Sequence, residues 1–431
     1  MRASGYVLYT CGQLGVMMLT RYFFQWIIRF SDGSAAATSP GASDVALFSA
    51  AAVGAVFFAF RIFDAVIDPV IGLFADGWSK RGRDRRSLLW LSFPLAPLGL
   101  ALVFTPALEM APALRWGLLG AGMLFFFFGY SLYIIPYWSL IDDYAAGDAR
   151  VRTRISNAQG VGLLLATGVG FVLSPIAVAR WGFRGGAVAF ALLGALLMVL
   201  PYFAGRPARA ASSSEESSPG FAALAEAFRD RKFRAVVVLF AGAQMSFTVM
   251  TAAAPYIAER LLGGTLKDVA LLLGPFLLAA LPSFVFVPRI AARLGWEKFT
   301  LLATVGLGVA YSGAGLLGQG IVGSPLTTAM IVFACAGPAA AVILGLEAEA
   351  ITRSAAETGH GRIGIYFGLF NFVVQALNGF AVYLMGILAE EARTSVAVVR
   401  FMPFLAGALC LLGVVLYLVL RRANAAAPNV A

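Results

Sequence analysis

The sequence predicts an all-α polytopic membrane protein in which twelve transmembrane helices are arranged as two halves of six. Three observations lead to this prediction. Apolar residues make up 60% of the 431 residues, whereas they make up about half of an average soluble domain. Charged residues contribute 13%, which is about half of their usual share. Long apolar stretches recur along the chain, and short polar segments separate them.

The composition argues against several classes of protein. The 22 acidic and 32 basic residues are too few to cover a soluble protein of this size, and the mean hydropathy of +0.84 agrees. A soluble enzyme, a nucleic-acid-binding protein and a secreted disulfide-rich domain are therefore not expected. The net charge of +10 does not indicate a nucleic acid as partner, because the basic residues lie in short loops between apolar stretches.

Residue types that carry metal and enzyme chemistry are scarce. Cys11, Cys335 and Cys410 lie inside apolar stretches, where we expect them to pack as small side chains rather than to bind a metal or form a disulfide. The single histidine, His360, lies in a polar loop. The sequence contains neither a nucleotide-binding loop of the Walker type nor a recognisable nucleophile–base arrangement. We therefore expect a protein that is not an enzyme and has no cofactor.

The transmembrane stretches follow from length and composition. A helix needs about 20 mostly apolar residues to cross a bilayer, and twelve stretches meet this requirement. They are residues 5–30, 45–75, 87–106, 115–141, 157–180, 186–204, 234–260, 267–290, 298–318, 325–348, 363–388 and 398–421.

The basic residues predict the orientation in the membrane. The loops on one side, together with both termini, carry 22 lysine and arginine residues, whereas the loops on the other side carry six. Because cytoplasmic loops are enriched in these residues, we expect both termini in the cytoplasm. The expected location is the cell (inner) membrane, and the expected state is a monomer.

The longest hydrophilic segment divides the chain into two halves. Residues 1–204 form the N-terminal six-helix half, residues 205–233 form a cytoplasmic linker, and residues 234–431 form the C-terminal six-helix half. Within the linker, residues 221–233 have apolar side chains at nearly helical spacing among charges, which predicts an amphipathic helix at the membrane surface. Two six-helix halves joined in this way are typical of the major facilitator fold, with a substrate cavity between the halves.

The second apolar stretch contains charged residues, which are costly in a membrane and therefore indicate function. Asp64 and Asp68 are four residues apart, so their carboxylates lie on one face of a helix, which Arg61 can share. Two adjacent carboxylates repel each other, and a bound cation or a shared proton relieves this repulsion. The alternative is an inert ion pair in which Arg61 neutralises one aspartate, although the second carboxylate then stays unpaired.

Three sequence blocks resemble the glycoside–pentoside–hexuronide:cation symporter family. The first is RIFDAVIDPVIGLFAD, followed by the basic loop KRGRDRR. The second is IPYWSL, followed by RTR. The third is TG, followed by GIYFGLFNF. These blocks lie, in this order, at residues 61–86, 135–154 and 358–372.

The resemblance implies a cation-coupled transporter whose coupling ion is H⁺ or Na⁺. Asp64 and Asp68 match the cation-binding acids of the family, and Ser131 matches a hydroxyl ligand in the fourth helix. At Ile67 the sequence departs from the family, because sodium-coupled members have an asparagine there. A proton needs only the carboxylates, so this departure favours H⁺. Apart from Na⁺ at the two aspartates, we expect no metal.

The resemblance also implies substrate-binding positions, and most of them have changed. Acids of the family fall at Met17 and Ile134, an arginine falls near Gln159, and a lysine falls at Gln375, whereas Trp138 is retained. Four charged contacts have thus become apolar or amide side chains, so the sugars that the family transports cannot be assumed to be the substrates of this protein. The implied substrate-binding residues are Met17, Ile134, Trp138, Gln159, Asn371 and Gln375.

Arg21 is a further candidate for substrate binding. Gln13, Met17 and Arg21 lie at intervals of four residues, on one helix face. A buried arginine needs an anion, which is either a substrate carboxylate or phosphate or one of the aspartates of the second helix. Alternatively, Arg21 extends to the outer membrane surface beside Arg29.

Clusters of opposite charges follow the second, fourth and tenth stretches, where this fold closes its cytoplasmic gate. We select Asp76 and Arg152 as gate residues, and Arg61 as the charge partner within the second helix. Many of the other loop charges are expected to be solvated and to contribute little.

The predicted function is symport of a small organic solute, of the sugar or sugar-acid type, coupled to a cation. One alternative is an exporter or flippase of an amphiphile such as a drug or lysolipid, which the loss of charged contacts and the phenylalanines at residues 125–128 allow. A second alternative is a receptor or scaffold, and the pair of mutually repelling aspartates argues against it. The expected partners are therefore a small molecule and the lipid bilayer.

Overall fold

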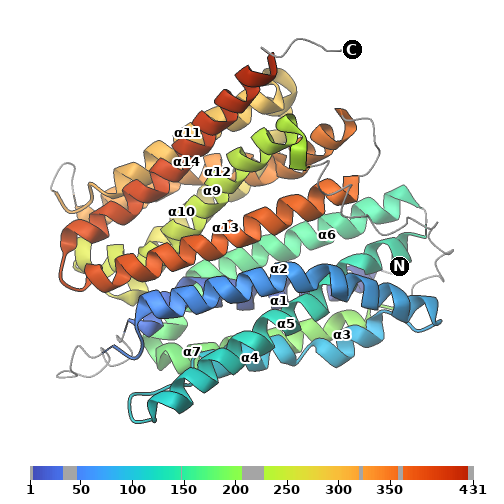
Figure 1. Ribbon diagram of the computed structural model, residues 1–431, viewed down its shortest axis with the longest axis horizontal. Coiled ribbons are helices and arrows are strands. Elements are labelled where there is room, and N and C mark those ends of the chain that lie inside the picture. Colours follow the sequence, from blue (N-terminus) through green and yellow to red (C-terminus); the bar gives the residue numbers. More distant parts are fainter. Residues whose placement is uncertain are drawn as a thin grey trace. The chain divides into compact units, whose positions relative to one another are not determined.

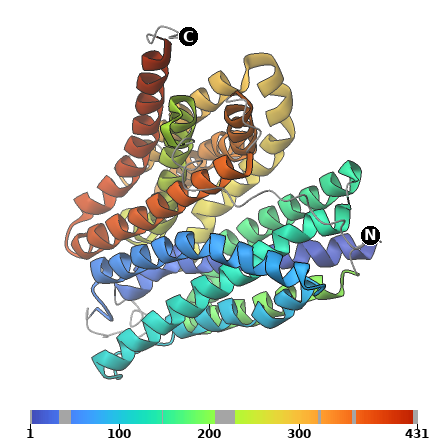
Figure 2. The same cartoon turned by 45° about the vertical axis from the view of Figure 1, so that its right-hand side comes forward.

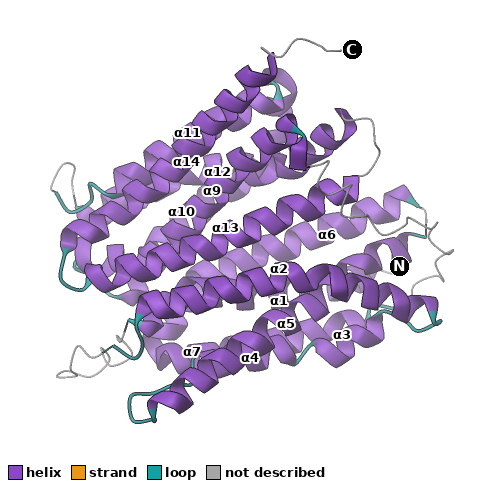
Figure 3. Cartoon of the chain, in the orientation of Figure 1, coloured by secondary structure: helices purple, strands orange, loops and turns teal. Residues whose placement is uncertain are grey.

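The computed structural model describes residues 3–32, 46–146, 148–205, 228–319, 324–357 and 363–425. All regular secondary structure in these residues is helical (Figure 3). The chain divides into an N-terminal unit, Met1–Glu215, and a C-terminal unit, Glu216–Ala431. Each unit is described by itself.

The described helices of the N-terminal unit (Figure 1) correspond to the first six predicted stretches. They are α1 (Ala3–Ser31), α2 (Ala50–Lys80), α3 (Arg86–Ser92), α4 (Leu95–Val103), α5 (Pro112–Ala145), α6 (Ala149–Gly168), the π-helical segment η2 (Val169–Leu173), α7 (Ser174–Val199) and the 3₁₀-helical segment η3 (Leu200–Phe203).

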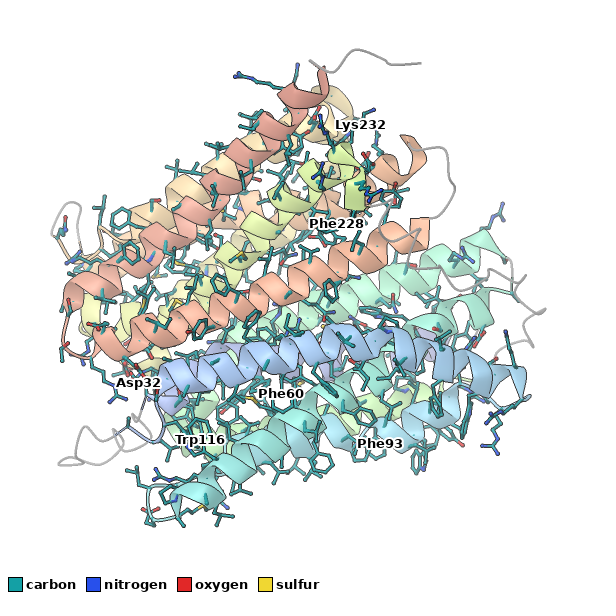
Figure 4. The ribbon with its side chains drawn as sticks, in the orientation of Figure 1. Asp32, Phe60, Phe93, Trp116, Phe228 and Lys232 are labelled. Carbon is teal, nitrogen blue, oxygen red and sulfur yellow. The ribbon has the colours of Figure 1, made fainter. Side chains whose placement is uncertain are left out.

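Two breaks in the N-terminal unit have local causes. Pro94 lacks a backbone N–H and separates α3 from α4 in a single stretch, Arg86–Val103, that crosses the membrane once. Phe93, labelled in Figure 4, lies at this break. Gly182 has φ +70°, a backbone conformation that only glycine adopts without strain. This kink divides α7, so that its two parts belong to the fifth and sixth crossings.

The described helices of the C-terminal unit correspond to the other six stretches (Figure 2). They are α9 (Arg231–Tyr256), the π-helical segment η4 (Ile257–Leu261), the 3₁₀-helical segment η5 (Leu266–Asp268), α10 (Val269–Leu294), α11 (Trp296–Ala314), α12 (Pro325–Glu357), α13 (Ile363–Ala392) and α14 (Val396–Ala425).

The described helices account for the twelve predicted crossings. Nine helical segments are long and apolar enough to span a membrane, and one of them, Arg150–Phe203, has 54 residues with the Gly182 kink inside it, which is long enough for two crossings. The remaining two crossings are α1 and α11, which are less apolar. Helix α1 carries arginine and glutamine side chains, and α11 begins with Glu297 and Lys298.

The end of the linker differs from the prediction of an amphipathic helix over residues 221–233. Residues 221–227 lie outside the described residues. The Asp230 side chain accepts a hydrogen bond from the backbone of Lys232 and caps the start of α9 at Arg231. Residues 231–233 therefore belong to the seventh crossing, because an aspartate N-cap begins a new helix there. Phe233 is buried and packs edge-on against Tyr366, with ring centroids 4.7 Å apart.

Glycines set how closely α1 packs against the fifth crossing. A Cβ added to Gly162 would lie 2.8 Å from the Cβ of Gln13, and one added to Gly170 would lie 2.4 Å from the Cβ of Arg21. Both distances are too short for a real side chain. Small residues allow such close backbone approach in membranes, and here they hold Gln13 and Arg21 against the fifth crossing.

Candidate cation and substrate sites

Asp64 lies at the centre of a charged cluster that joins α2 to α5. Its side chain is fully buried. One carboxylate oxygen accepts a hydrogen bond from the Arg61 guanidinium at 2.5 Å, and the other accepts one from the Ser131 hydroxyl at 2.5 Å. The structure therefore brings together the predicted cation ligands Asp64 and Ser131 and the predicted charge partner Arg61.

Two aromatic rings hold the Arg61 guanidinium in place. Its carbon atom Cζ lies 5.4 Å from the ring centroid of Phe24 and 5.5 Å from that of Phe127. Phe60, labelled in Figure 4, stacks parallel to Phe127 with centroids 6.2 Å apart. Cation–π contact with rings of α1 and α5 stabilises the arginine charge in an otherwise apolar environment.

Asp68 extends the cluster by one turn of α2. It is half-buried and interacts electrostatically with Asp64. Tyr130, which precedes Ser131 in α5, is also close enough to interact electrostatically with both acids. Helix α2 continues through Pro69, and because proline has no N–H, the carbonyl of Ala65 has no helical partner. Oxygen atoms are the ligands that H⁺ and Na⁺ use, and this segment supplies two carboxylates, a hydroxyl and a freed carbonyl.

Arg21 lies against the π-helical segment η2. Its guanidinium carbon is 5.8 Å from the ring centroid of Phe171, and its Nε atom is buried without a hydrogen-bond partner. Within the described part of the chain, no acid forms an ion pair with Arg21. The structure thus does not show the predicted alternative in which Arg21 pairs with Asp64 or Asp68. Tyr130 is close enough to interact electrostatically with Arg21.

Two predicted substrate residues of the N-terminal unit, Trp138 and Gln159, take part in polar contacts on α1, α5 and α6. The Trp138 indole donates a hydrogen bond to the Gln13 side chain at 3.2 Å, and the Gln159 amide donates to the Tyr9 hydroxyl at 3.0 Å. Tyr9 and Tyr137 stack with centroids 4.4 Å apart. Each tyrosine hydroxyl donates to the backbone carbonyl of the other residue.

The predicted substrate residues of the N-terminal unit differ in how far their side chains are exposed. The Trp138 side chain is 41% exposed, whereas Ile134, one turn away on α5, is 2% exposed. Met17 is half-buried. In this conformation Trp138 is therefore open to contact, and Ile134 faces packed helices.

The predicted substrate residues of the C-terminal unit lie on α13. Asn371 is exposed and Gln375 is half-buried. Their spacing of four residues places them on one helix face.

A second group of polar residues on α9, α12 and α13 was not predicted. The Gln244 amide donates a hydrogen bond to Glu347 at 2.8 Å, and the Thr248 hydroxyl lies 3.0 Å from the Asn378 side-chain oxygen. The charge cluster expected after the tenth stretch contains both Glu347 and Glu349, with Arg353 and Arg362. In the structure Glu349 pairs with Arg353 at 2.6 Å, whereas Glu347 contacts Gln244. The signal in the sequence was the spacing of Gln244 and Thr248, one turn apart within an apolar stretch.

The cytoplasmic charges differ in part from the predicted gate. The side chain of Asp76 lies outside the described residues. Arg152 lies in the first turns of α6 and is exposed. The structure shows an ion pair between Arg85, which precedes α3, and Asp143 of α5, at 2.6 Å. Arg86 binds Asp84 at 2.5 Å.

Comparisons with known proteins identify the family. A model of the family described as MFS/sugar transport protein matches residues 8–421. The chain belongs to the MFS/sugar transport protein family. This result confirms the resemblance carried by the three sequence blocks. No curated protein matches the sequence significantly.

Structural similarity agrees with this family. The crystal structure of a mutant of the nucleoside transporter NupG superimposes with a TM-score of 0.65 over 96% of this chain and 99% of that chain. The sequence identity is 12%, so the similarity establishes the major facilitator fold alone. As a member of the MFS/sugar transport protein family, the protein is a multi-pass membrane transporter of a small molecule and not an enzyme.

Proposed function

We propose that the protein is a cation-coupled symporter of a small organic solute, of the sugar or sugar-acid type, that works by alternating access. The observation that carries this proposal is the pair of acids on α2, where buried Asp64 binds Arg61 and Ser131 and Asp68 follows one turn later. Membership of the MFS/sugar transport protein family supports secondary transport as the activity.

The charges of the cluster explain how it couples an ion to transport. Arg61 forms an ion pair with Asp64, and Asp68 adds a second carboxylate to the same membrane-spanning helix. A bound cation lowers the cost of the carboxylate charge. A cation bound at this site then favours the conformational change of the transporter that also holds the solute, which links accumulation of the solute to the cation gradient.

The ligands available favour a proton as the coupling ion. Both oxygens of Asp64 already accept hydrogen bonds from Arg61 and Ser131, and Ile67 supplies no oxygen. Sodium needs several oxygen ligands at once, whereas a proton needs only one carboxylate. We therefore infer H⁺ coupling, with Na⁺ as the alternative ion.

The substrate proposal rests on Trp138 and the residues near it. An exposed tryptophan can stack on the apolar face of a sugar ring. Gln13 and Gln159 lie in the same polar network and offer hydrogen bonds. In the C-terminal unit, Asn371 and Gln375 are the proposed contributors. We further propose that both termini are cytoplasmic, in the inner membrane, and that the monomer is the functional state.

The structure divides the phenylalanines that allow the amphiphile alternative, because Phe125 is exposed whereas Phe126 and Phe127 are buried. The phenylalanines at residues 125–128 were one reason to consider a lipid-like cargo. Phe126 and Phe127 are each 1% exposed, and both pack against Phe23, with ring centroids 4.5 and 5.6 Å from it. They form the core of the unit and do not line a path for a lipid chain.

The experiment that tests the function is uptake into proteoliposomes. Neutral sugars, uronates and lysolipids are offered under an imposed H⁺ gradient, an imposed Na⁺ gradient or no gradient. We expect a sugar or uronate to accumulate above its external concentration only under a cation gradient. Accumulation without any gradient dependence would overturn the coupling, and transport of lysolipids alone would overturn the substrate class.

A further inference from the structure

The C-terminal unit contains a polar belt that the proposed coupling site does not use. The belt consists of Gln244 and Thr248 on α9, Glu347 on α12, and Asn378 on α13. All four side chains are half-buried and lie within membrane-spanning segments. Polar side chains are costly in an apolar environment unless they bind something.

Contacts inside the belt connect three helices. Gln244 donates to Glu347 at 2.8 Å, and Thr248, one turn further along α9, is 3.0 Å from the Asn378 side-chain oxygen. The Thr248 hydroxyl is also 3.1 Å from the backbone carbonyl of Gln244. The four side chains therefore form two hydrogen-bonded pairs, one turn apart along α9.

The belt keeps unused hydrogen-bonding capacity of both kinds. A carboxylate accepts up to about four hydrogen bonds, and among the described residues Glu347 receives one from a side chain, that of Gln244. The side-chain N–H₂ group of Asn378 donates to no described residue, and the side-chain oxygen of Gln244 accepts from none. No described cation pairs with Glu347.

This mixture of groups distinguishes the belt from an ion site and from a structural crosslink. The cluster at Asp64 consists of two acids with an arginine and a serine hydroxyl. In the belt, each of the two contacts joins two helices, and groups on Glu347, Gln244 and Asn378 are left over from these contacts. The belt therefore offers acceptors on Glu347 and Gln244 beside a donor on Asn378. A hydroxyl group donates one hydrogen bond and accepts others, so neighbouring hydroxyls fit such a surface.

We propose that the polar belt binds hydroxyl groups of the transported solute, with Glu347 accepting from one hydroxyl and Asn378 donating to another. This inference rests on the proposed function and adds the chemical class of the bound groups, which is a neutral polyhydroxylated portion. Glu347 repels an anion, so a carboxylate on the same solute must bind elsewhere.

The test measures equilibrium binding, which needs no ion gradient. The probes are glucose, galactose, xylose, their monodeoxy analogues, a primary amine of similar size and a lysolipid. Binding to the full-length protein in detergent is followed by thermal stabilisation, with Glu347→Gln and Asn378→Ala compared with wild type. Glu349→Gln is the matched control, because Glu349 lies on the same helix but pairs with exposed Arg353.

We expect a sugar to stabilise the wild type and Glu349→Gln, and Glu347→Gln to weaken its binding about tenfold, since an amide oxygen is a weaker hydrogen-bond acceptor than a carboxylate. One deoxy analogue should bind wild type less tightly than its parent, and this difference should disappear in Glu347→Gln. Asn378→Ala gives a second measure if Glu347→Gln does not fold, as judged by circular dichroism and gel filtration.

Several results would overturn the proposal. They are binding of a sugar with equal affinity to wild type and to both belt variants, binding of the amine or the lysolipid but of no sugar, and binding of no probe at all. The coupling proposal fails separately. If sugars bind and the belt variants weaken that binding, but accumulation does not depend on an ion gradient, the belt proposal stands and the symport proposal falls.

Discussion

At the residue scale, the chemistry of the protein depends on charges that are buried in pairs or left without a pair. Asp64 shares its oxygens between Arg61 and Ser131, whereas the buried Nε atom of Arg21 has no hydrogen-bond partner. A buried charge without an ion-pair partner suits the capture of a ligand of opposite sign.

The first prediction concerns the two acids of α2. Replacing Asp64 or Asp68 by Asn should abolish gradient-driven accumulation and leave downhill exchange measurable, because the cation loses its carboxylates while the substrate residues stay. The measurement is counterflow alongside uptake in proteoliposomes. Asp148→Asn is the control, because Asp148 is an exposed N-cap of α6 and Asn also caps helices. Full accumulation by both single variants would refute the assignment.

The second prediction concerns Arg21. Because no described acid pairs with it, we expect a negatively charged group of the substrate to do so. Wild type should then prefer a uronate over its neutral parent sugar, and Arg21→Gln should lose this preference. Competition of the two compounds in exchange assays measures it. Arg29→Gln is the control on the same helix, and its preference should be that of wild type, since Arg29 lies 3.6 Å from Asp32.

Two outcomes would show the Arg21 prediction to be wrong. The first is a preference of the wild type for the neutral sugar. The second is an anion preference that persists in Arg21→Gln.

At the element scale, the close approach of α1 to η2 positions Arg21. The Ser174 hydroxyl binds the carbonyl of Gly170 at 2.5 Å, and the Trp26 indole donates to Ser174 at 2.9 Å. A π-helical turn widens the helix and changes the direction of its side chains, and such turns are frequent at functional sites. Here the turn and its glycine make room for a long cationic side chain.

The third prediction concerns this packing. Gly170→Ala should destabilise the protein by about 1–3 kcal/mol, because the new methyl group would overlap Arg21 and force the helices apart. Thermal unfolding in detergent measures the change. Gly160→Ala is the matched control, because an added Cβ there has no atom within 4 Å, and alanine in a helix stabilises by about 0.5–1 kcal/mol relative to glycine. Equal stability of the two variants would contradict the prediction.

At the scale of the whole molecule, each unit carries its own polar group within apolar helices. The N-terminal unit has the Asp64 cluster and the network around Trp138, and the C-terminal unit has the polar belt. In an alternating-access transporter both halves take part in binding.

The fourth prediction tests whether residues of both units contribute to binding of the substrate. Trp138→Ala and Gln375→Ala should each raise the apparent KM for the transported sugar by about tenfold, because each removes a stacking or hydrogen-bonding partner. Concentration-dependent exchange measures the effect. Trp181→Ala, which removes an equally large exposed indole near the Gly182 kink, should leave the KM unchanged. Unaltered KM values in both test variants would remove these residues from the binding site.

The fifth prediction concerns the orientation. Since basic residues are concentrated in the loops on the side of both termini, a fluorescent protein that matures only in the cytoplasm should fluoresce at either end. A periplasmic phosphatase fused to either end should be inactive. Activity of the phosphatase at one terminus would reverse the orientation or change the number of crossings.

The sequence by itself determined the properties that depend on near neighbours along the chain. Twelve apolar stretches predicted the crossings, because each must bury its own backbone polar groups in a helix about 20 residues long. The i, i+4 spacing of Asp64 and Asp68 put both acids on one helix face for the same local reason. The breaks at the proline between α3 and α4 and at the aspartate before α9 are similarly local, and neither was predicted.

Contacts between residues far apart in the sequence were decided by tertiary structure alone. Glu347 is 103 residues from Gln244 along the chain, and nothing in the sequence near Glu347 distinguishes a cytoplasmic ion pair with Arg353 from an amide contact inside the membrane. The absence of a described acid beside Arg21 likewise depends on which face of η2 meets α1. Helix packing fixes such contacts, because side chains from different helices meet only once backbones interlock at small residues such as Gly162 and Gly170.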